Sequence, residues 1–217
     1  MEDIYQLKNE NENNNNSNNN NNIINTFSSN IIGENNEIII IQKISDLLTD
    51  LCDENTKDYK SEKSPYIKPF LSIIIPSISI KDYLWRLYKY SKINSSTIIL
   101  ILIYIDRLCN INKFKLTYYN IHKLILASMI IAIKYNEDEY YSIKIYAKLG
   151  GVTIPEINLL EYAFIALLNF NLFVTNELFN KYNDYISSVD SEEDDYDNEN
   201  NENNENDENS DNNWNEE

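Results

Sequence analysis

The segment from Ile121 to Tyr135, IHKLILASMIIAIKY, constrains the fold more than any other part of the chain. From Leu124 to Ile133 only Ser128 interrupts a run of apolar and small residues, so no polar face is left over. A helix that is apolar all round is either a membrane span or the centre of a helical protein. A span needs about 20 apolar residues, and this run ends after ten, at Lys134. The sequence therefore predicts a buried central helix and leaves its terminal lysine to be explained.

Charge and composition divide the chain into three parts. Residues 1–37 are dominated by asparagine, and residues 188–217 hold fourteen Asp and Glu with no Lys or Arg. Such segments bury too little apolar area to fold, so both tails are predicted to be disordered. The formal charge of -17 comes mostly from the acidic tail, because residues 71–187 hold twelve Lys or Arg against nine Asp or Glu. Nucleic-acid binding needs a concentrated basic face, so it is not expected.

Several functional classes lack their characteristic residues. The N-terminus is acidic and Asn-rich, unlike a signal peptide. Cys52 and Cys109 form no disulfide framework, and with a single histidine ordinary zinc spacing is absent. Three glycines cannot build a glycine-rich phosphate loop. We therefore expect a cytoplasmic or nuclear protein that uses no cofactor, metal, small-molecule ligand or membrane contact.

Residues 38–75 predict a short amphipathic helix followed by a proline-containing linker. Apolar residues recur at helical spacing at Ile41, Ile44, Leu47, Leu48 and Leu51. Four consecutive isoleucines leave a strand as the alternative. Pro65, Pro69 and Pro76 disfavour a helix between them, so residues 65–76 are predicted to be extended.

Residues 76–187 predict a separate domain of five or six helices. Its first helix is expected to begin near Ser79, with Asp82 in a capping interaction and with Lys81, Arg86 and Lys89 solvated. The second is predicted over Thr97–Cys109, capped by Ser95 or Ser96. Its β-branched residues resemble a buried strand, but no convincing strand lies nearby to pair with it.

Three more helices follow the central one. A short helix is predicted over Ser142–Leu149, with Gly150 as its left-handed cap. Thr153 and Glu156 have capping-box spacing before the next helix, whose inward stripe is Ile157, Leu160, Phe164, Leu167 and Leu168. The last helix is expected to end near Ile186.

A search for catalytic groups finds little. No Ser/His/Asp set is identifiable, and His122 is interpreted as a surface or N-terminal-turn histidine. Cys52 and Cys109 have no basic or helix-start setting, so both are interpreted as small hydrophobic residues. The acidic turn at 137–139 lacks the spacing of a calcium loop, which favours a solvated turn. The sequence therefore predicts a non-enzymatic protein.

Two charged residues remain as candidates: Lys134, which ends the apolar central helix, and Glu161, midway along the other core helix. A lysine at a helix end can place its stem on the core and its amine in water, and Glu161 can simply face outward. The alternative is that both side chains project onto one shared surface and bind a partner's backbone.

Four stretches of this domain together resemble the cyclin box: SISIKDYLWRLYKY, ILIYIDRL, NIHKLILASMIIAIKYNED and YAKLGGVTIPEINLLEYAFIALLNF. YIDRL is shared by many cyclins, whereas YAKLGG followed by E-x-N-x-L-E is more specific to the PHO80-like branch, also called P-type or U-type cyclins. The resemblance implies a single all-α, five-helix cyclin box with an extra N-terminal helix and a C-terminal helix.

The resemblance also implies a function. Cyclins bind and activate a cyclin-dependent serine/threonine kinase as a heterodimer, by packing on its αC helix. A lysine and a glutamate of the family bind main-chain groups beside that helix, and they match Lys134 and Glu161. Asp106 in YIDRL matches an aspartate that makes an internal salt bridge in the family; its usual arginine partner does not align here, and Arg86 is the expected substitute.

Two departures limit what the resemblance carries over. Only a tail follows Ile186 where many cyclins have a second box, as in the single-box PHO80-like branch. The first helix reads DYLWRLYKYSK and lacks the M-R-A-I-L substrate-docking motif. A helical scaffold derived from a cyclin box, without kinase activation, is the alternative function.

Overall fold

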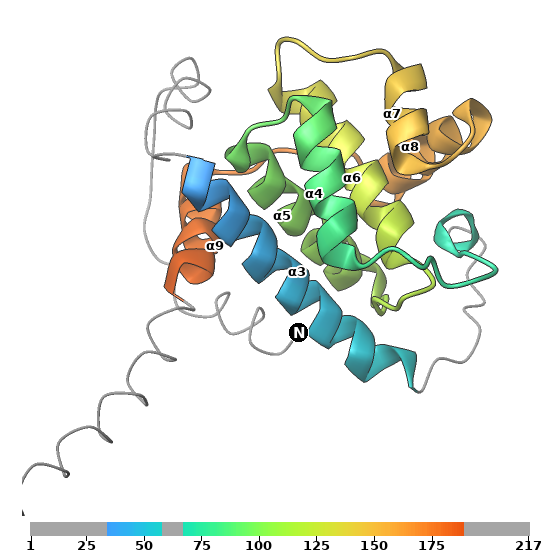
Figure 1. Cartoon of the computed structure of the whole chain (residues 1–217), viewed down its shortest axis with the longest axis horizontal. Helices are drawn as coiled ribbons and strands as arrows, with labels where there is room; N and C mark the ends of the chain where they lie inside the picture. The colour runs from blue at the N-terminus through green and yellow to red at the C-terminus, as the bar shows by residue number, and fades with distance from the viewer. Residues whose placement is uncertain (1–33, 58–66, 189–217) are drawn as a thin grey trace, which may run out of the picture.

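The computed structural model describes residues 34–57 and 67–188. Within these ranges the chain is helical and forms no strand, which confirms the all-α class (Figure 1). The helices are α3 (Glu34–Thr56), the 3-10 turn η1 (Lys68–Phe70), α4 (Ile80–Ser91), α5 (Ser95–Asn112), α6 (Ile121–Asn136), α7 (Ile143–Gly150), α8 (Ile154–Leu167) and α9 (Asn176–Ser188). Helices α4 to α8 form the predicted five-helix box, with α3 and α9 as the additional helices.

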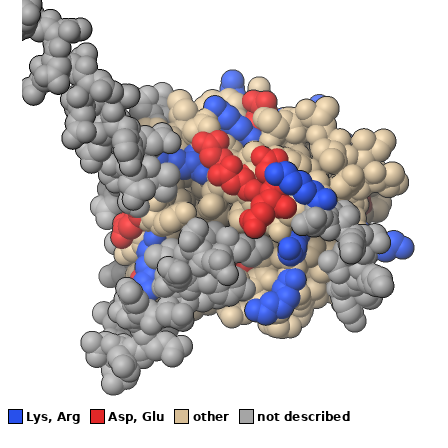
Figure 2. All heavy atoms as spheres, turned by 90° about the horizontal axis from the view of Figure 1, so that it is seen from below, with Lys and Arg blue, Asp and Glu red and all other residues tan. Residues whose placement is uncertain are grey.

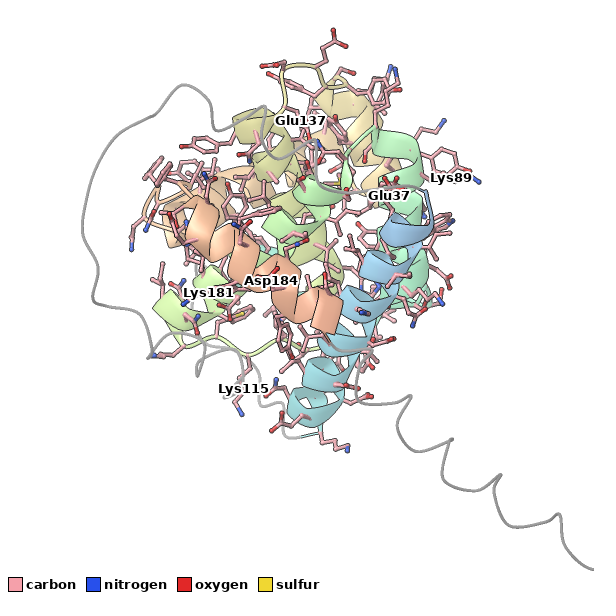
Figure 3. All side chains as sticks on the ribbon, turned by 90° about the vertical axis from the view of Figure 1, so that its left-hand side faces the viewer. Glu37, Lys89, Lys115, Glu137, Lys181 and Asp184 are labelled. Atoms are coloured by element: carbon pink, nitrogen blue, oxygen red, sulfur yellow. The ribbon has the colours of Figure 1, made fainter. Side chains whose placement is uncertain are left out.

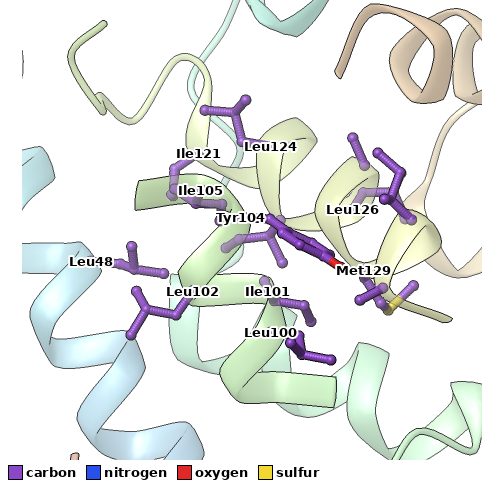
Figure 4. Packing of buried hydrophobic residues seen from close by; sticks show 14 of the residues in the cluster. Leu48, Leu100, Ile101, Leu102, Tyr104, Ile105, Ile121, Leu124, Leu126 and Met129 are labelled. Carbon is purple, nitrogen blue, oxygen red and sulfur yellow. The ribbon is translucent and has the colours of Figure 1, made fainter. Parts of the chain in front are cut away.

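The centre of the molecule is the contact between α5 and α6, which Figure 4 shows together with Leu48 of α3. Every residue of α6 from Leu124 to Ile133 is buried, as its apolar circumference predicts. Helix α5 is long and apolar enough to cross a membrane by length and composition alone, yet 78% of it is buried inside the protein. Neighbouring helices therefore account for its lack of a polar face.

Helix α3 is amphipathic and packs its apolar side on α4 and α5. Ile41, Ile44 and Leu48 are at most 2% exposed, so the strand alternative is wrong. The opposite side carries exposed acidic residues at helical spacing: Asp46, Asp50, Asp53 and Glu54. Acidic and basic side chains lie beside one another on the face seen from below (Figure 2). The helix begins at Glu34, so the predicted disordered segment 1–37 extends too far; its remainder and the tail 189–217 lie outside the described residues.

Helix starts follow the capping signals in two of three cases. The Ser79 hydroxyl accepts from the Asp82 N–H at 3.0 Å, and the Thr153 hydroxyl accepts from the Glu156 N–H at 3.3 Å. The start of α5 was predicted wrongly. Asn94 is its N-cap and accepts from the Thr97 N–H at 2.9 Å, so the serines after it lie in the first turn.

The proline-containing linker is not extended throughout. Pro69 lies in the first turn of η1, where a missing N–H costs nothing. Ile67 and Phe70 are 4% and 0% exposed, so the turn is anchored in the core.

The end of α7 differs by one residue from the prediction. Gly150 is still helical, and Gly151 takes the left-handed conformation at φ 70°. A Cβ on Gly150 would come within 2.3 Å of Leu126 Cδ2. The first glycine is thus explained by close packing on α6 and the second by the turn.

Helix α9 covers one side of α5, and Figure 3 looks onto it with Lys181 and Asp184 labelled. The Tyr182 hydroxyl donates to Asp106 Oδ2 of α5 at 2.6 Å. Side chains of α5 also hold the segment that connects α8 to α9. Tyr104 donates to the Leu172 carbonyl at 2.9 Å, and Arg107 donates to the Asn171 carbonyl at 2.7 Å.

Candidate functional site

Lys134 and Glu161 meet directly at the surface. Lys134 lies in the last turn of α6 and Glu161 near the middle of α8, and the Lys134 Nζ is 2.6 and 2.8 Å from the two carboxylate oxygens of Glu161. Buried neighbours on the same helices, Ile133 and Leu160, fix the two backbones from the core side. The structure thus brings together the two charged residues that the sequence singled out.

The sequence offered two simple interpretations, a hydrated Lys134 amine and an outward-facing Glu161, and neither is complete. The Lys134 side chain does reach the surface, with 36% of it exposed, but its amine is ion-paired rather than only hydrated. Glu161 is turned toward α6 and is 18% exposed. Ion pairs at a surface contribute about 0–1 kcal/mol to folding, so this pair is a minor term in the stability of the domain.

Exposed apolar side chains lie on the same two helices as the ion pair. Tyr135 follows Lys134 and is 51% exposed, and Tyr162 follows Glu161 and is 70% exposed. Ile154 and Leu159 of α8 are 42% and 52% exposed. We call the set Lys134, Tyr135, Ile154, Leu159, Glu161 and Tyr162 the docking face. Exposed apolar side chains grouped around a polar centre are typical of protein interaction sites.

The sequence analysis did not identify the apolar members of this face. On α8 the buried stripe uses one side of the helix, yet Leu159 and Tyr162 on the other side and Ile154 at its edge are exposed apolar residues. A helix with apolar residues on both sides needs either a second buried contact or a partner. The apolar residues of α8 outside its buried stripe could therefore have predicted this interaction site from the sequence.

Asp106 and Arg86 do not form the salt bridge that the family resemblance suggested. Asp106 is 7% exposed and accepts from the Tyr182 hydroxyl at 2.6 Å and from the Asn110 amide at 2.9 Å. Burial and, to a smaller extent, the Asp106 charge raise the pKa of Tyr182 well above its usual range. The carboxylate therefore holds α9 against α5.

Arg86 serves a different contact and is half-buried rather than solvated. Its guanidinium donates to the Leu149 carbonyl, and the neighbouring Tyr83 hydroxyl donates to the Gly150 carbonyl at 3.3 Å. The last carbonyls of a helix carry partial negative charge and lack partners within the helix. The Arg86 guanidinium therefore caps the C-terminus of α7.

His122 lies in the first turn of α6, as one of the two interpretations had it, but it is buried and 6% exposed. Its Nε2 is 2.9 Å from the Ile78 carbonyl and must carry the proton there, because a carbonyl only accepts. Burial lowers the pKa of His122, and the hydrogen bond to Ile78 opposes that shift in part. The imidazole therefore stays neutral in the folded protein near pH 7.

The remaining candidate groups have structural surroundings. Cys52 and Cys109 are free and buried, as expected of small hydrophobic residues. Burial raises the pKa of the Cys52 thiol to about 12. In the acidic turn, the Glu137 carboxylate accepts from the Thr97 hydroxyl and joins the end of α6 to the start of α5. Among residues 34–57 and 67–188, no three His, Cys, Asp or Glu side chains group as a metal site would require.

Comparisons with known proteins agree with this architecture. The family model described as Cyclin matches residues 3–172. Cyclin-U2-1 of Arabidopsis thaliana is 37% identical over 109 residues, which are 50% of this chain and 49% of that protein. Cyclin-U4-1 of the same plant is 32% identical over 145 residues, covering 66% of this chain and 72% of the relative.

A fungal relative extends the comparison. The PHO85 cyclin-like protein psl1 of Schizosaccharomyces pombe is 37% identical over 105 residues, 48% of this chain and 43% of that protein. The chain thus spans about half the length of several curated relatives it matches. The U-type and PHO85 cyclin-like names of these relatives confirm the branch that the motifs indicated. The chain therefore belongs to the cyclin family, with the PHO80-like cyclins as its relatives.

Proposed function

We propose that this chain is a regulatory subunit that binds a cyclin-dependent protein kinase through the docking face and activates it. The observation that carries the proposal is the Lys134–Glu161 pair, which joins α6 and α8 at the surface, on helices that also carry exposed apolar side chains. Family membership supports a regulatory role, and the name of the fungal relative, a PHO85 cyclin-like protein, supports a kinase as partner.

The pair offers both kinds of hydrogen-bonding group to a partner's backbone. A lysine amine has three donors, and a carboxylate has about four acceptor sites. The mutual contact at 2.6 and 2.8 Å uses only some of them and holds both side chains in one place. Because the two groups are already positioned, binding loses less side-chain entropy than it would with free side chains.

The apolar part of the face suits a helix. Leu159 and Tyr162, three residues apart on α8, are exposed on neighbouring turns, and Ile154 is exposed in its first turn. An amphipathic helix packs its apolar side on such a surface. In a kinase the αC helix carries the glutamate that must pair with the β3 lysine before phosphoryl transfer.

Activation then follows from a shift in population. A rigid helical surface packed on αC favours the inward position of that helix, in which the lysine–glutamate pair forms. The chain itself supplies no reacting group. It acts by differential binding to the active conformation of the kinase.

Affinity purification from native cells, followed by mass spectrometry and a peptide kinase assay, tests the proposal. We expect a cyclin-dependent kinase to copurify and its activity to depend on this chain. A copurifying kinase whose activity is the same without the chain would support the scaffold alternative.

A charge swap separates binding from internal structure. Lys134→Glu combined with Glu161→Lys keeps an ion pair between α6 and α8 but exchanges donor and acceptor positions. If the pair binds the kinase backbone, the swapped variant folds normally and does not activate the kinase. Full activation by the swapped variant would mean that the pair only joins the two helices.

A further inference from the structure

Three consecutive isoleucines lie exposed just before α4. Ile73, Ile74 and Ile75 are 99%, 80% and 40% exposed. Single exposed apolar residues are common, but contiguous ones mark interaction sites. No function assigned above uses this segment, which we call the isoleucine loop (residues 73–75).

The chain on either side of the isoleucine loop is fixed to the protein. Before it, Phe70 is fully buried with its ring edge-on to Phe164 of α8, at 6.1 Å between centroids. The Ser72 N–H donates to the Tyr119 carbonyl at 2.7 Å. After it, the Ile78 carbonyl accepts from His122 at 2.9 Å. The loop is therefore held out from the surface by anchors on both sides, which lowers the entropy cost of binding through it.

The base of the loop meets the start of α8. The Lys123 amine is 3.3 Å from the Leu71 carbonyl and 2.9 Å from the Glu156 carboxylate. Glu156 lies in the first turn of α8 beside Ile154, an apolar member of the docking face. In Figure 1 the segment between η1 and α4 lies on the same side of the molecule as α8. The base of the isoleucine loop is thus joined through Lys123 to the first turn of α8, where Ile154 of the docking face lies.

We propose that the isoleucine loop is a second apolar contact for the same kinase. The loop would pack on an apolar patch of the kinase that lies next to the kinase helix bound by the docking face. This inference rests on the proposed function. The link from Leu71 through Lys123 to Glu156 places the base of the loop next to the first turn of α8, so a kinase bound at the docking face is the occupant that the loop would meet. A second copy of this chain is the competing occupant.

Titration calorimetry with a purified PHO85-type cyclin-dependent kinase tests the inference. The variant Ile73→Ser with Ile74→Ser removes the two most exposed isoleucines, and Ile111→Ser is the matched control, since Ile111 is 43% exposed in the last turn of α5. We expect the double variant to bind at least about 10-fold more weakly and the control to bind like the wild type. Circular dichroism should give the same helix content for all three, because the substituted side chains face solvent.

The outcomes separate the two proposals. A wild-type chain that does not bind the kinase contradicts the proposed function. Wild-type binding together with an unchanged affinity of the double variant overturns the loop contact alone. Analytical ultracentrifugation tests the competing occupant, a second copy of this chain. If the wild type forms a homodimer, the double variant does not, and kinase affinity is unchanged, the loop serves self-association.

Discussion

At the scale of single residues, the two adjacent glycines have different physical reasons. Gly151 needs a left-handed backbone, whereas Gly150 lies where α7 presses on Leu126 of α6. Leu126 is fully buried, so its side chain has no free space to move into. The glycine pair was visible in the sequence, but the contact that requires its first member depends on how α6 and α7 pack.

Gly150→Ala tests this contact. The added methyl would lie 2.3 to 3.1 Å from three atoms of Leu126, and overpacking of this kind costs about 1–3 kcal/mol. Urea unfolding followed by circular dichroism measures the loss. Gly151→Asn is the control, because asparagine tolerates the left-handed conformation and open space surrounds that position apart from Arg86. Equal stability of Gly150→Ala and the wild type would contradict the packing explanation.

His122 makes stability depend on pH. Its pKa is lowered in the folded protein, so the unfolded chain binds the proton more readily. The contribution of His122 to the free energy of unfolding is fully present above the pKa of the unfolded chain, about 6.5. It declines as the pH falls from there toward the lower pKa of the folded protein. We expect the melting temperature to fall between pH 7 and pH 5 more steeply in the wild type than in His122→Gln. Identical slopes in the two proteins would show that folding does not shift the pKa of His122.

At the scale of elements, local sequence patterns predicted the helices but not the side-chain hydrogen bonds that connect one helix to another. The stripe of α8 and the caps at Ser79 and Thr153 depend on residues within one or two turns, and the structure has them. The contacts of Arg86 with α7 and of Asp106 with α9 connect residues 63 and 76 positions apart. Sequence spacing carries no information on such pairs, so a partner borrowed from the family resemblance was wrong.

The bond between α5 and α9 predicts a measurable effect. Tyr182→Phe removes the hydroxyl that donates to the buried Asp106 carboxylate. A hydrogen bond to a charged group contributes about 1.5–3 kcal/mol, so we expect a loss of that size in the free energy of unfolding from urea titration. Asp184→Asn, on the exposed side of the same helix, should change it by less than about 0.5 kcal/mol. Similar values for the two variants would mean that α9 is held by its apolar residues alone.

At the scale of the whole molecule, a rigid core presents an exposed and partly apolar surface. Helices α5 and α6 are almost wholly buried, which fixes the end of α6 at which Lys134 reaches the surface. The sequence predicted the central helix and the two charged residues. The sequence could not predict that Lys134 and Glu161 form an ion pair, because the distance between their side chains depends on how α6 crosses α8.

The central claim is that Lys134 and Glu161 bind the kinase backbone. The most direct measurement is the affinity of Lys134→Ala with Glu161→Ala for a purified PHO85-type cyclin-dependent kinase, by titration calorimetry. Removing buried, hydrogen-bonded interface charges costs about 2–5 kcal/mol, while helix content should stay unchanged. Asp46→Ala with Asp50→Ala, which removes two exposed charges of α3 outside both proposed contacts, is the control. A loss of that size with intact helix content is the predicted result, and unchanged affinity of the folded Lys134/Glu161 variant would contradict the account.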